Sequence, residues 1–280
     1  MLTEQLDYLG FVVLMTAIYA GMAIWLWRSR AMLLPRWLIS AALTILAVGW
    51  FPVQHAGQAE AQRVRAMLIG FAPTYALEMA RMGHADLRLD TRGDDPRFLQ
   101  MIEVQKRWLA VNPAVASVYT LRRRPDGKFV FMVGAEVDYN RDGVYSGPRE
   151  RRVLPGDLYQ EAGSFWLRGL EGETAFDDRP YTDEWGTWVS AVTPMYDANG
   201  RIEGVLGVDY DAETFERAVG GVRKVVIGLV GLLLLSMLAK NVEADVSVIG
   251  LVGERGRMGA WRDLRHCPRR ADFLRALCGC

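Results

Sequence analysis

Cysteine is nearly missing from this 280-residue chain. The three cysteines present, Cys267, Cys278 and Cys280, all lie close to the C-terminus, so no disulfide can brace the long segment before them. His266 stands beside Cys267, but the spacing of these four residues matches no zinc-binding pattern. We therefore expect reduced thiols without a structural role.

Histidine and net charge are also scarce. The three histidines, His55, His84 and His266, fall in three different segments, which argues against a catalytic triad or a histidine metal cluster. The 33 basic residues balance 33 acidic ones, so no overall positive field favours nucleic acid as a partner. These absences disfavour several common kinds of enzyme and nucleic-acid-binding protein.

A phosphate-binding loop of the Walker A type is missing as well. The only Gly-Lys pair in the chain is Gly127-Lys128, and the position five residues before that glycine holds Arg122 where the motif needs glycine. Nucleotide hydrolysis therefore lacks the loop that would hold the phosphates.

What the chain does have is three long uncharged runs. Residues 8–27 contain twenty residues without a charge, which as a helix span roughly 30 Å, the thickness of a bilayer core. Residues 37–53 form a second run, and residues 225–239 form a third, which reaches only about 23 Å. Flanking basic side chains could extend the third span by reaching to the interfaces. We predict three transmembrane helices; the alternative is buried core helices.

The orientation of these spans follows from the arginines. Glu4 and Asp7 precede the first run, which is wrong for a cleaved signal peptide, so we expect that helix to be retained. The short loop between the first two runs carries Arg28, Arg30 and Arg36, which places it in the cytoplasm by the positive-inside rule. The chain is thus predicted to be a multi-pass protein of the inner (plasma) membrane, with the lipid bilayer as its first partner.

Four regions follow from this topology. Residues 1–54 hold two transmembrane helices and a cytoplasmic loop, and residues 55–220 form one extracytoplasmic domain. Residues 221–240 hold the third transmembrane helix, and residues 241–280 form a short cytoplasmic tail. Arg223 lies on the outer side of the third span, against the positive-inside trend.

The extracytoplasmic region reads as an α+β domain. Apolar residues at helical spacing and a Pro after two Asp predict a long helix over 59–82, kinked at Pro73, and a second helix from Pro96. Turn residues predict two hairpins, with strands at 115–124, 128–138, 187–197 and 201–211, and we expect a short helix over 158–172, a loop ending in 177–186 and a helix from Ala212. Hairpins give an antiparallel sheet, which we expect to carry its helices on one side.

The second hairpin has a recognisable sequence, "VSAVTPMYDANGRIEGVLGVDYD" (189–211). It resembles the hairpin of the PDC or Cache sensor domains, the PAS-like extracytoplasmic input modules of bacterial histidine kinases, diguanylate cyclases and chemoreceptors. The resemblance covers about Ala59 to Phe215. It implies a cleft on one face of the sheet for a small molecule or ion. We also expect a homodimer, and we expect the missing output to come from a separate cytoplasmic signalling partner or from a lost C-terminus.

Candidate ligand-binding residues lie on the elements that match this family: Tyr119, Phe131, Trp185, Trp188 and Asp209. Aromatic walls with one carboxylate would suit a small amine or an amino acid. The alternative is that these aromatic residues belong to the core. Amino-acid-binding members place Arg, Trp and Tyr together at the end of the second helix, whereas here Arg107 and Trp108 have no following Tyr.

A loop rich in oxygen ligands follows the first hairpin. The predicted metal ligands are Asp138, Asn140, Asp142, Val144 and Ser146, at positions 1, 3, 5, 7 and 9 of an EF-hand-like loop with Gly143 at position 6. Position 12 is Arg149 where a bidentate Glu would be needed, with Glu150 next to it. The loop is therefore either a Ca²⁺ site or an Asx-rich turn.

The tail contains a segment typical of an enzyme. "VSVIGLVGERGRMG" (246–259) reads as a buried strand entering a Gly-rich turn, and residues 241–257 resemble the catalytic segment of flagellar and type III secretion export ATPases. That resemblance would assign Glu254 to polarising the attacking water. The rest of such a catalytic core has no counterpart, and the pattern stops after Arg257, which suggests a shifted reading frame or a fused fragment.

Together these features predict a membrane-anchored extracytoplasmic sensor that binds a small ligand or ion and passes a conformational signal across the membrane. We expect no catalytic residues, and the output domain is expected to be missing. The first alternative is a structural or interaction membrane protein with a ligand-free domain. A fragment of an ATPase is the weaker alternative.

Overall fold

The structure is a computed structural model that describes residues 2–28, 34–140, 142–145, 147, 149–160 and 163–264, the last with side chains to residue 243. Its contacts divide the chain into two compact units. One consists of Met1–Val53 with Lys224–Cys280, and the other of Gln54–Arg223. We treat each unit by itself.

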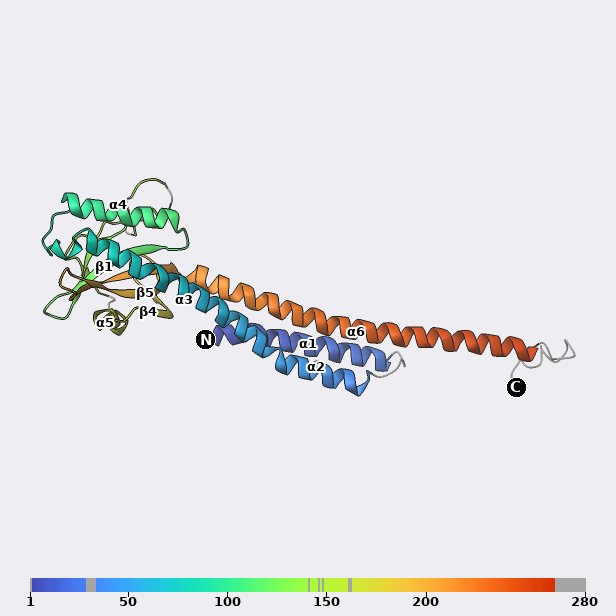
Figure 1. The fold of residues 1–280 in the computed structure, drawn as a ribbon. Helices are drawn as coiled ribbons and strands as arrows, with labels where there is room; N and C mark the ends of the chain where they lie inside the picture. The colour runs from blue at the N-terminus through green and yellow to red at the C-terminus, as the bar shows by residue number, and fades with distance from the viewer. Residues whose placement is uncertain are drawn as a thin grey trace. The chain divides into compact units, whose positions relative to one another are not determined.

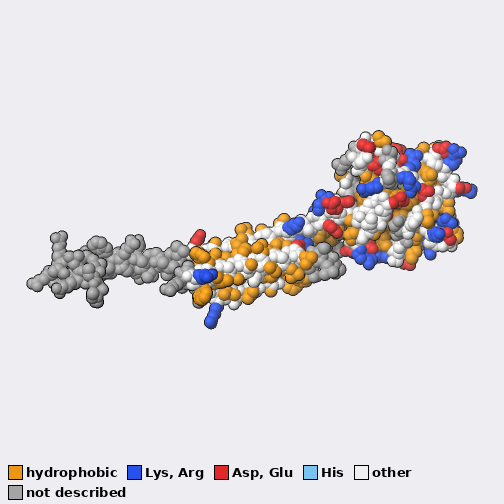
Figure 2. Space-filling view, turned by 180° about the vertical axis from the view of Figure 1, so that it is seen from behind, with side chains coloured by type: hydrophobic (Ala, Val, Ile, Leu, Met, Phe, Trp, Pro, Cys, Tyr) orange, Lys and Arg blue, Asp and Glu red, His pale blue; other side chains and the backbone are white. Residues whose placement is uncertain are grey.

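The first unit is helical and apolar. It contains α1 (Leu2–Arg28), α2 (Arg36–Val48), the beginning of α3 (Trp50–Arg81) and most of α6 (Ala212–Leu264). Three stretches are long and apolar enough to cross a membrane: Leu6–Arg28, Arg36–Arg81 and Ala212–Glu243. Figure 2 shows hydrophobic side chains gathered over these helices, whereas charged side chains are scattered over the other unit. The prediction of three long apolar helices is confirmed.

Two tyrosines tie the helices of the first unit together. The hydroxyl of Tyr8 donates to the carbonyl oxygen of Leu46 at 2.6 Å, and that of Tyr19 donates to the carbonyl oxygen of Leu234 at 2.7 Å. Since a hydroxyl in hydrocarbon has no water to bond, each finds a backbone acceptor on a neighbouring helix. α1 thus contacts both α2 and α6 within this unit.

The second unit is built on one antiparallel sheet. Its strands are β1 (Ser117–Arg123), β2 (Phe129–Gly134), β3 (Leu158–Tyr159), β4 (Ala175–Thr182), β5 (Thr187–Tyr196) and β6 (Ile202–Asp211), in the spatial order β3-β2-β1-β6-β5-β4. Every pairing is antiparallel. The predicted α+β class with an antiparallel sheet and a long first helix is confirmed.

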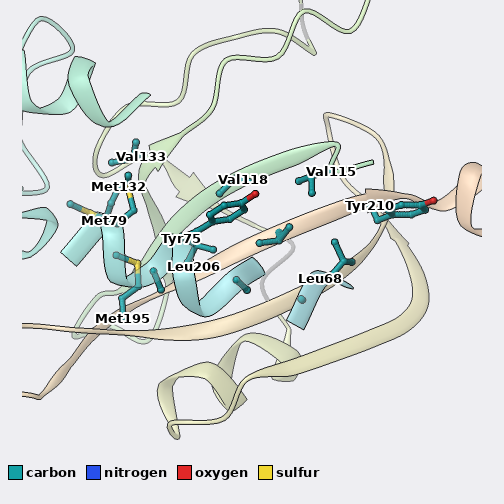
Figure 3. Close-up of a cluster of buried hydrophobic side chains, with 14 of the residues drawn as sticks. Leu68, Tyr75, Met79, Val115, Val118, Met132, Val133, Met195, Leu206 and Tyr210 are labelled. Atoms are coloured by element: carbon teal, nitrogen blue, oxygen red, sulfur yellow. The ribbon is translucent and has the colours of Figure 1, made fainter. Parts of the chain in front are cut away.

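One face of this sheet carries the larger core. α3, α4 (Pro96–Val111) and the start of α6 pack on it, as Figure 1 lets the reader follow for α3 and α4. Figure 3 shows this cluster, in which Leu68, Tyr75 and Met79 of α3 lie against Val118, Met132, Met195 and Leu206 of the strands. Because side chains alternate along a strand, the residues between these point to the opposite face.

The opposite face holds a second, smaller core. Here Trp166 of α5 (Ser164–Leu170) packs with Tyr119, Leu121, Val192 and Val205. The prediction that helices cover one side only is therefore wrong. The reason is that β5 and β6 are buried on both faces, with apolar residues at successive positions, and a sheet of that kind needs cover on each side.

Local sequence signals, such as capping and turn residues, correctly predicted most of these elements. The carboxylate of Asp95 caps α4 by accepting from the backbone N–H groups of Arg97 and Phe98 at 2.9 and 3.1 Å, and Pro96 opens the helix. Gly127 adopts a φ of 86° in the β1–β2 turn, a conformation that favours glycine. Both predicted hairpins are present, joined at the predicted turns.

Three local predictions are wrong. The start of the helix expected over 158–172 is β3, and the loop expected over 177–186 contains most of β4. β4 lies at the sheet edge, where a polar sequence with Pro180 is tolerated. Residues 246–259, read as a strand and a turn, lie within α6 and are helical. The cysteines and His266 lie outside the described residues.

Candidate functional site

A pocket opens on the α5 side of the sheet, between the strands and the segment that joins β2 to β3. The empty space inside it, counted together with the open solvent at its mouth, is about 480 Å³. All five residues that the sequence suggested for ligand binding line it: Tyr119, Phe131, Trp185, Trp188 and Asp209. They come from β1, β2, the β4–β5 turn, β5 and β6, so the fold brings together residues up to 90 positions apart. Their contact with a ligand stays a prediction.

Asp209 is the most unusual of these residues. It lies near the end of β6, paired with Ser117 of β1 on one side and Ser190 of β5 on the other, and it is only 2% exposed. Its Oδ1 accepts hydrogen bonds from Ser190 Oγ at 2.5 Å, Tyr119 OH at 3.2 Å and Tyr181 OH at 3.3 Å. Burial outweighs these bonds and raises the pKa of Asp209 to about 7.

The tyrosines beside Asp209 remain donors at all ordinary pH values. Burial, and the nearby carboxylate of Asp209, raise the pKa of Tyr119 and of Tyr181 well above the usual range. The two hydroxyls also lie 3.2 Å from each other. The Asp209 carboxylate is therefore surrounded by hydroxyl donors, and no cationic side chain is bonded to it in the described part of the chain.

Aromatic rings form the walls of the pocket. The ring of Phe131 lies 5.7 Å from that of Tyr119 and 5.3 Å from that of Trp185, and Tyr139 lies 6.0 Å from Trp188. Asp183 fixes the β4–β5 turn by accepting from the backbone N–H of Trp185 and from Trp188 Nε1, both at 2.9 Å. These contacts hold the indole rings in place.

Charged residues at the rim of the pocket differ in how deeply their side chains are buried. Arg149 and Arg151 are exposed, whereas the neighbouring Glu150 is buried with 6% exposure. Arg149 Nε donates to the carbonyl oxygen of Trp185 at 2.5 Å, and Arg151 forms ion pairs with Asp157 at 3.1 Å and Glu184 at 3.3 Å. The positive charges thus lie at the surface and the carboxylates lie deeper.

Three polar atoms in the pocket lack a partner among the described residues. Glu150 Oε2 and the hydroxyl of Tyr159 are buried without a hydrogen bond. Oδ2 of Asp209 likewise accepts none in the described part of the chain, because all three bonds go to Oδ1. Since buried polar groups in proteins are nearly always paired, these atoms mark where a ligand or water would bind.

Sequence reasoning missed several of these residues: Ser190, Tyr181, Tyr159, Tyr139, Glu150 as a pocket residue, and Asp183. Ser190 could have been found, since it lies two positions after Trp188 on a predicted strand and thus on the same face. Tyr181 and Tyr159 lie on β4 and β3, the two strands that were not predicted. Glu150 reaches the pocket through an irregular segment that carries no periodic signal.

The candidate amino-acid motif lies elsewhere. Trp108 of α4 stacks on Tyr75 of α3, with 4.2 Å between ring centroids and 8° between planes, within the core on the opposite face of the sheet. Arg107 is exposed on α4. Neither residue lines the pocket. The departure from the family motif seen in the sequence therefore concerns residues that do not take part in this site.

The oxygen-rich loop forms a set of Asx turns. Asp138 accepts from the backbone N–H groups of Asp142 and Gly143 at 3.2 and 2.8 Å, and Asp142 accepts from that of Val144 at 2.7 Å. The side chain of Asn140 donates to Asp142 at 2.9 Å. Ser146 lies outside the described residues. No group of three or more His, Cys, Asp or Glu side chains is placed to hold a metal within the described ranges. Binding of Ca²⁺ here stays a prediction.

Comparison with known proteins shows likeness in structure only. No protein-family model and no curated protein matches the sequence. The chain is similar to the ligand-binding domain of the Campylobacter jejuni chemoreceptor Tlp3, solved with L-valine, at 14% identity over 66% of this chain and 68% of that one, with a TM-score of 0.43.

Two further similarities are of the same kind. The ligand-binding domain of the Pseudomonas aeruginosa PAO1 amino acid chemoreceptor PctC, solved with GABA, is 18% identical over 63% of this chain and 67% of that one, with a TM-score of 0.38. The extracellular domain of the putative histidine kinase mmHK1S-Z2 is 22% identical over 57% and 58%, with a TM-score of 0.36. These are similarities to ligand-binding domains of chemoreceptors and to the extracellular domain of a putative histidine kinase, and they say nothing about this chain's ligand.

Proposed function

We propose that this chain is a membrane-anchored sensor whose sheet-containing unit lies outside the cytoplasm and binds a small molecule in the pocket around Asp209. The observation that carries the proposal is the pocket itself. It combines aromatic walls, a buried carboxylate with one oxygen unpartnered in the described part of the chain, and an opening to solvent. Such concave apolar sites with a few converging polar groups are the usual form of small-molecule sites.

The composition of the pocket supports binding over catalysis. The described residues that line it include no His, Cys or Lys, the side chains that most often act as base or nucleophile near neutral pH. Asp209 is held by three hydroxyl groups and has no general-base partner among them. A carboxylate in this setting is suited to pairing with a ligand cation.

Two helices connect the sheet-containing unit with the membrane. α3 and α6 each run from residues of that unit into residues of the apolar unit, at 53–54 and 223–224, without a break in the helix. A ligand that favours one packing of the sheet on α3 and α6 could therefore bias the two spans. Within the sheet-containing unit the two helices touch where Arg223 donates to Gln54 at 2.7 Å. The signal would pass to a separate cytoplasmic partner, and a homodimer is the expected assembly.

A ligand screen on the full chain in detergent tests this proposal. We expect at least one compound among small amines, amino acids including valine and GABA, carboxylates and Ca²⁺ to raise the thermal unfolding temperature, because a ligand that binds only the folded state stabilises it. The shift should be lost in Asp209→Asn and kept in Asp90→Asn, a change of an exposed carboxylate paired only with exposed Arg88. Dimerisation without any ligand-induced shift would favour the structural alternative.

A further inference from the structure

The unpartnered oxygens of two acidic residues in the pocket suggest the chemical class of its ligand. Asp209 and Glu150 both line the pocket, and Glu150 Oε2 is a buried atom without a hydrogen bond. Asp209 Oδ2 likewise accepts no hydrogen bond in the described part of the chain. Both side chains are more than nine-tenths buried, at 2% and 6% exposure. The remaining hydrogen bonds of each residue go to the other oxygen: Glu150 Oε1 accepts from the backbone N–H of Asn140 at 3.1 Å.

An unpaired carboxylate oxygen in such a place is costly. Burying a charged group without a partner costs several kcal/mol in real proteins, and the cost falls when a donor or an opposite charge is supplied. Glu150 Oε2 is such an oxygen, and the buried hydroxyl of Tyr159, among the same lining residues, also lacks a hydrogen bond. Asp209 Oδ2 accepts no hydrogen bond in the described part of the chain. Together these three atoms form a set of acceptors. A ligand that fits this set must bring donors, and preferably positive charge.

The cationic side chains at the rim are already engaged elsewhere. Arg149 donates to the carbonyl oxygen of Trp185 and lies 4.9 Å over the ring of Tyr139, and Arg151 pairs with Asp157 and Glu184. Glu136, the other acidic residue of the lining near this end, is paired with Lys106 and Arg152. Asp209 and Glu150 have no ion pair in the described part of the chain.

We infer that the pocket binds a short aliphatic diamine, with one ammonium group at Asp209, the other at Glu150, and the hydrocarbon chain between the aromatic rings. This inference rests on the proposed ligand-binding function. Each ammonium group offers three donors, enough for a carboxylate oxygen and a neighbouring hydroxyl such as that of Tyr159. Rings such as Phe131 and Trp185 attract cations through their faces and cover methylene groups by apolar contact.

Other ligand classes fit the same atoms less well. An anionic ligand would place its charge against two buried carboxylates. A divalent metal ion prefers several oxygen ligands gathered around one point, and the walls here are aromatic. A monoamine would leave one of the two carboxylates without an ammonium partner.

Binding measured by calorimetry on the full chain in detergent, at about pH 8, tests the inference. The probes are the α,ω-diamines from two to five carbons, the corresponding monoamines, valine, GABA and Ca²⁺. We expect one diamine length to bind about tenfold or more tightly than its monoamine, because the second charge-assisted hydrogen bond is worth roughly a factor of ten. A clear optimum in chain length should appear, because one diamine must reach both carboxylates at once.

Isosteric variants separate the two ends of the ligand. Glu150→Gln should reduce diamine affinity to within about threefold of the monoamine and leave monoamine affinity nearly unchanged. Asp209→Asn should weaken both by about tenfold or more, and Asp90→Asn should change neither. Circular dichroism of each variant establishes that it is folded.

Four outcomes would overturn the inference. Equal affinity for diamine and monoamine, or Ca²⁺ binding that depends on both carboxylates without diamine binding, would show that Glu150 does not hold an ammonium group. Binding of another probe that is lost in Asp209→Asn, without amine binding, would refute the diamine and leave the sensor proposal standing. If no probe binds, both fail.

Discussion

At the residue scale, burial and hydrogen bonding have opposing effects on the pKa of Asp209. Its position between Ser117 and Ser190 in adjacent strands buries it in the sheet, where water cannot solvate its charge. Three hydroxyl donors lower its pKa, but burial dominates and raises it to about 7. The folded protein therefore contains a carboxyl group that changes its charge near neutral pH, next to the pocket.

This pKa predicts how stability varies with pH. Because the pKa of Asp209 is about 7 in the folded state and near 3.8 in the unfolded state, the folded state binds more protons between these values. The contribution of Asp209 to stability is thus greatest below about pH 4, is lost as the pH rises to about 7, and stays lost above it. Asp209→Asn should remove this loss of stability, because asparagine does not titrate.

The measurement is the thermal unfolding temperature of the ligand-free full chain at several pH values. At about pH 8 we expect Asp209→Asn to be more stable than the natural sequence by roughly 2–4 kcal/mol, and at about pH 4 to be equal or slightly less stable. Asp90→Asn serves as the control and should show the natural pH profile. A variant that is less stable at pH 8 would show that the carboxylate is stabilised by a group we have not identified.

At the scale of elements, the sheet explains which predictions succeeded. β1, β2, β5 and β6 are long or strongly apolar and are joined by turn sequences, so local signals define them. β3 has two residues and β4 is polar at the sheet edge, so their pairing comes only from neighbouring strands. Whether helices pack on one face of the sheet or on both likewise depends on tertiary structure, because each apolar face of the sheet has to be covered.

The packing of α5 on the sheet depends on one glycine. A Cβ atom at Gly169 would lie 2.6 Å from Val205 Cγ1 and 2.8 Å from Val192 Cγ2, both on central strands. We expect Gly169→Ala to move α5 away from the sheet and to lower the free energy of unfolding by about 1–3 kcal/mol. Thermal unfolding followed by tryptophan fluorescence measures the effect, since Trp166 lies on this helix.

Gly70→Ala is the matched control for that substitution. Gly70 lies within α3, is exposed, and has no atom within 4 Å of a built Cβ. Alanine should therefore stabilise the protein by about 0.5–1 kcal/mol through helix propensity alone. If both variants were equally stable, α5 would pack less closely on the sheet than the structure describes.

At the scale of the whole molecule, three helices are long and apolar enough to cross a membrane, which suggests membrane anchoring. Large hydrophobic side chains such as Val13, Trp27, Leu43 and Leu232 are exposed on the first unit, which only a lipid environment would cover favourably. The arginines between the first two apolar runs predict that this part of the chain is cytoplasmic, and the proposed function then requires the sheet-containing unit to lie outside.

Accessibility of introduced cysteines tests this topology. In a variant whose three tail cysteines are replaced by alanine, Asp126→Cys in the β1–β2 turn should react in intact cells with a maleimide that cannot cross the membrane. Ser29→Cys, in the loop before the second span, should react only after the cells are permeabilised. The positive-inside rule predicts this pattern, and the reverse pattern would place the pocket in the cytoplasm and refute an extracytoplasmic sensor.

Short-range properties of the chain could be predicted from the sequence: three apolar helices, an α+β class and two hairpins, each of which depends on composition or on neighbours a few positions apart. The five residues that line the pocket were instead chosen from the elements that resemble a known family of sensor domains. The pocket itself depends on tertiary structure, because pairings such as Ser190 with Asp209 and the approach of Glu150 join distant segments. Burial then sets the pKa of Asp209 and leaves Glu150 Oε2 without a hydrogen-bond partner in the described part of the chain. Solvation and long-range contacts control both properties, so no local pattern could reveal them.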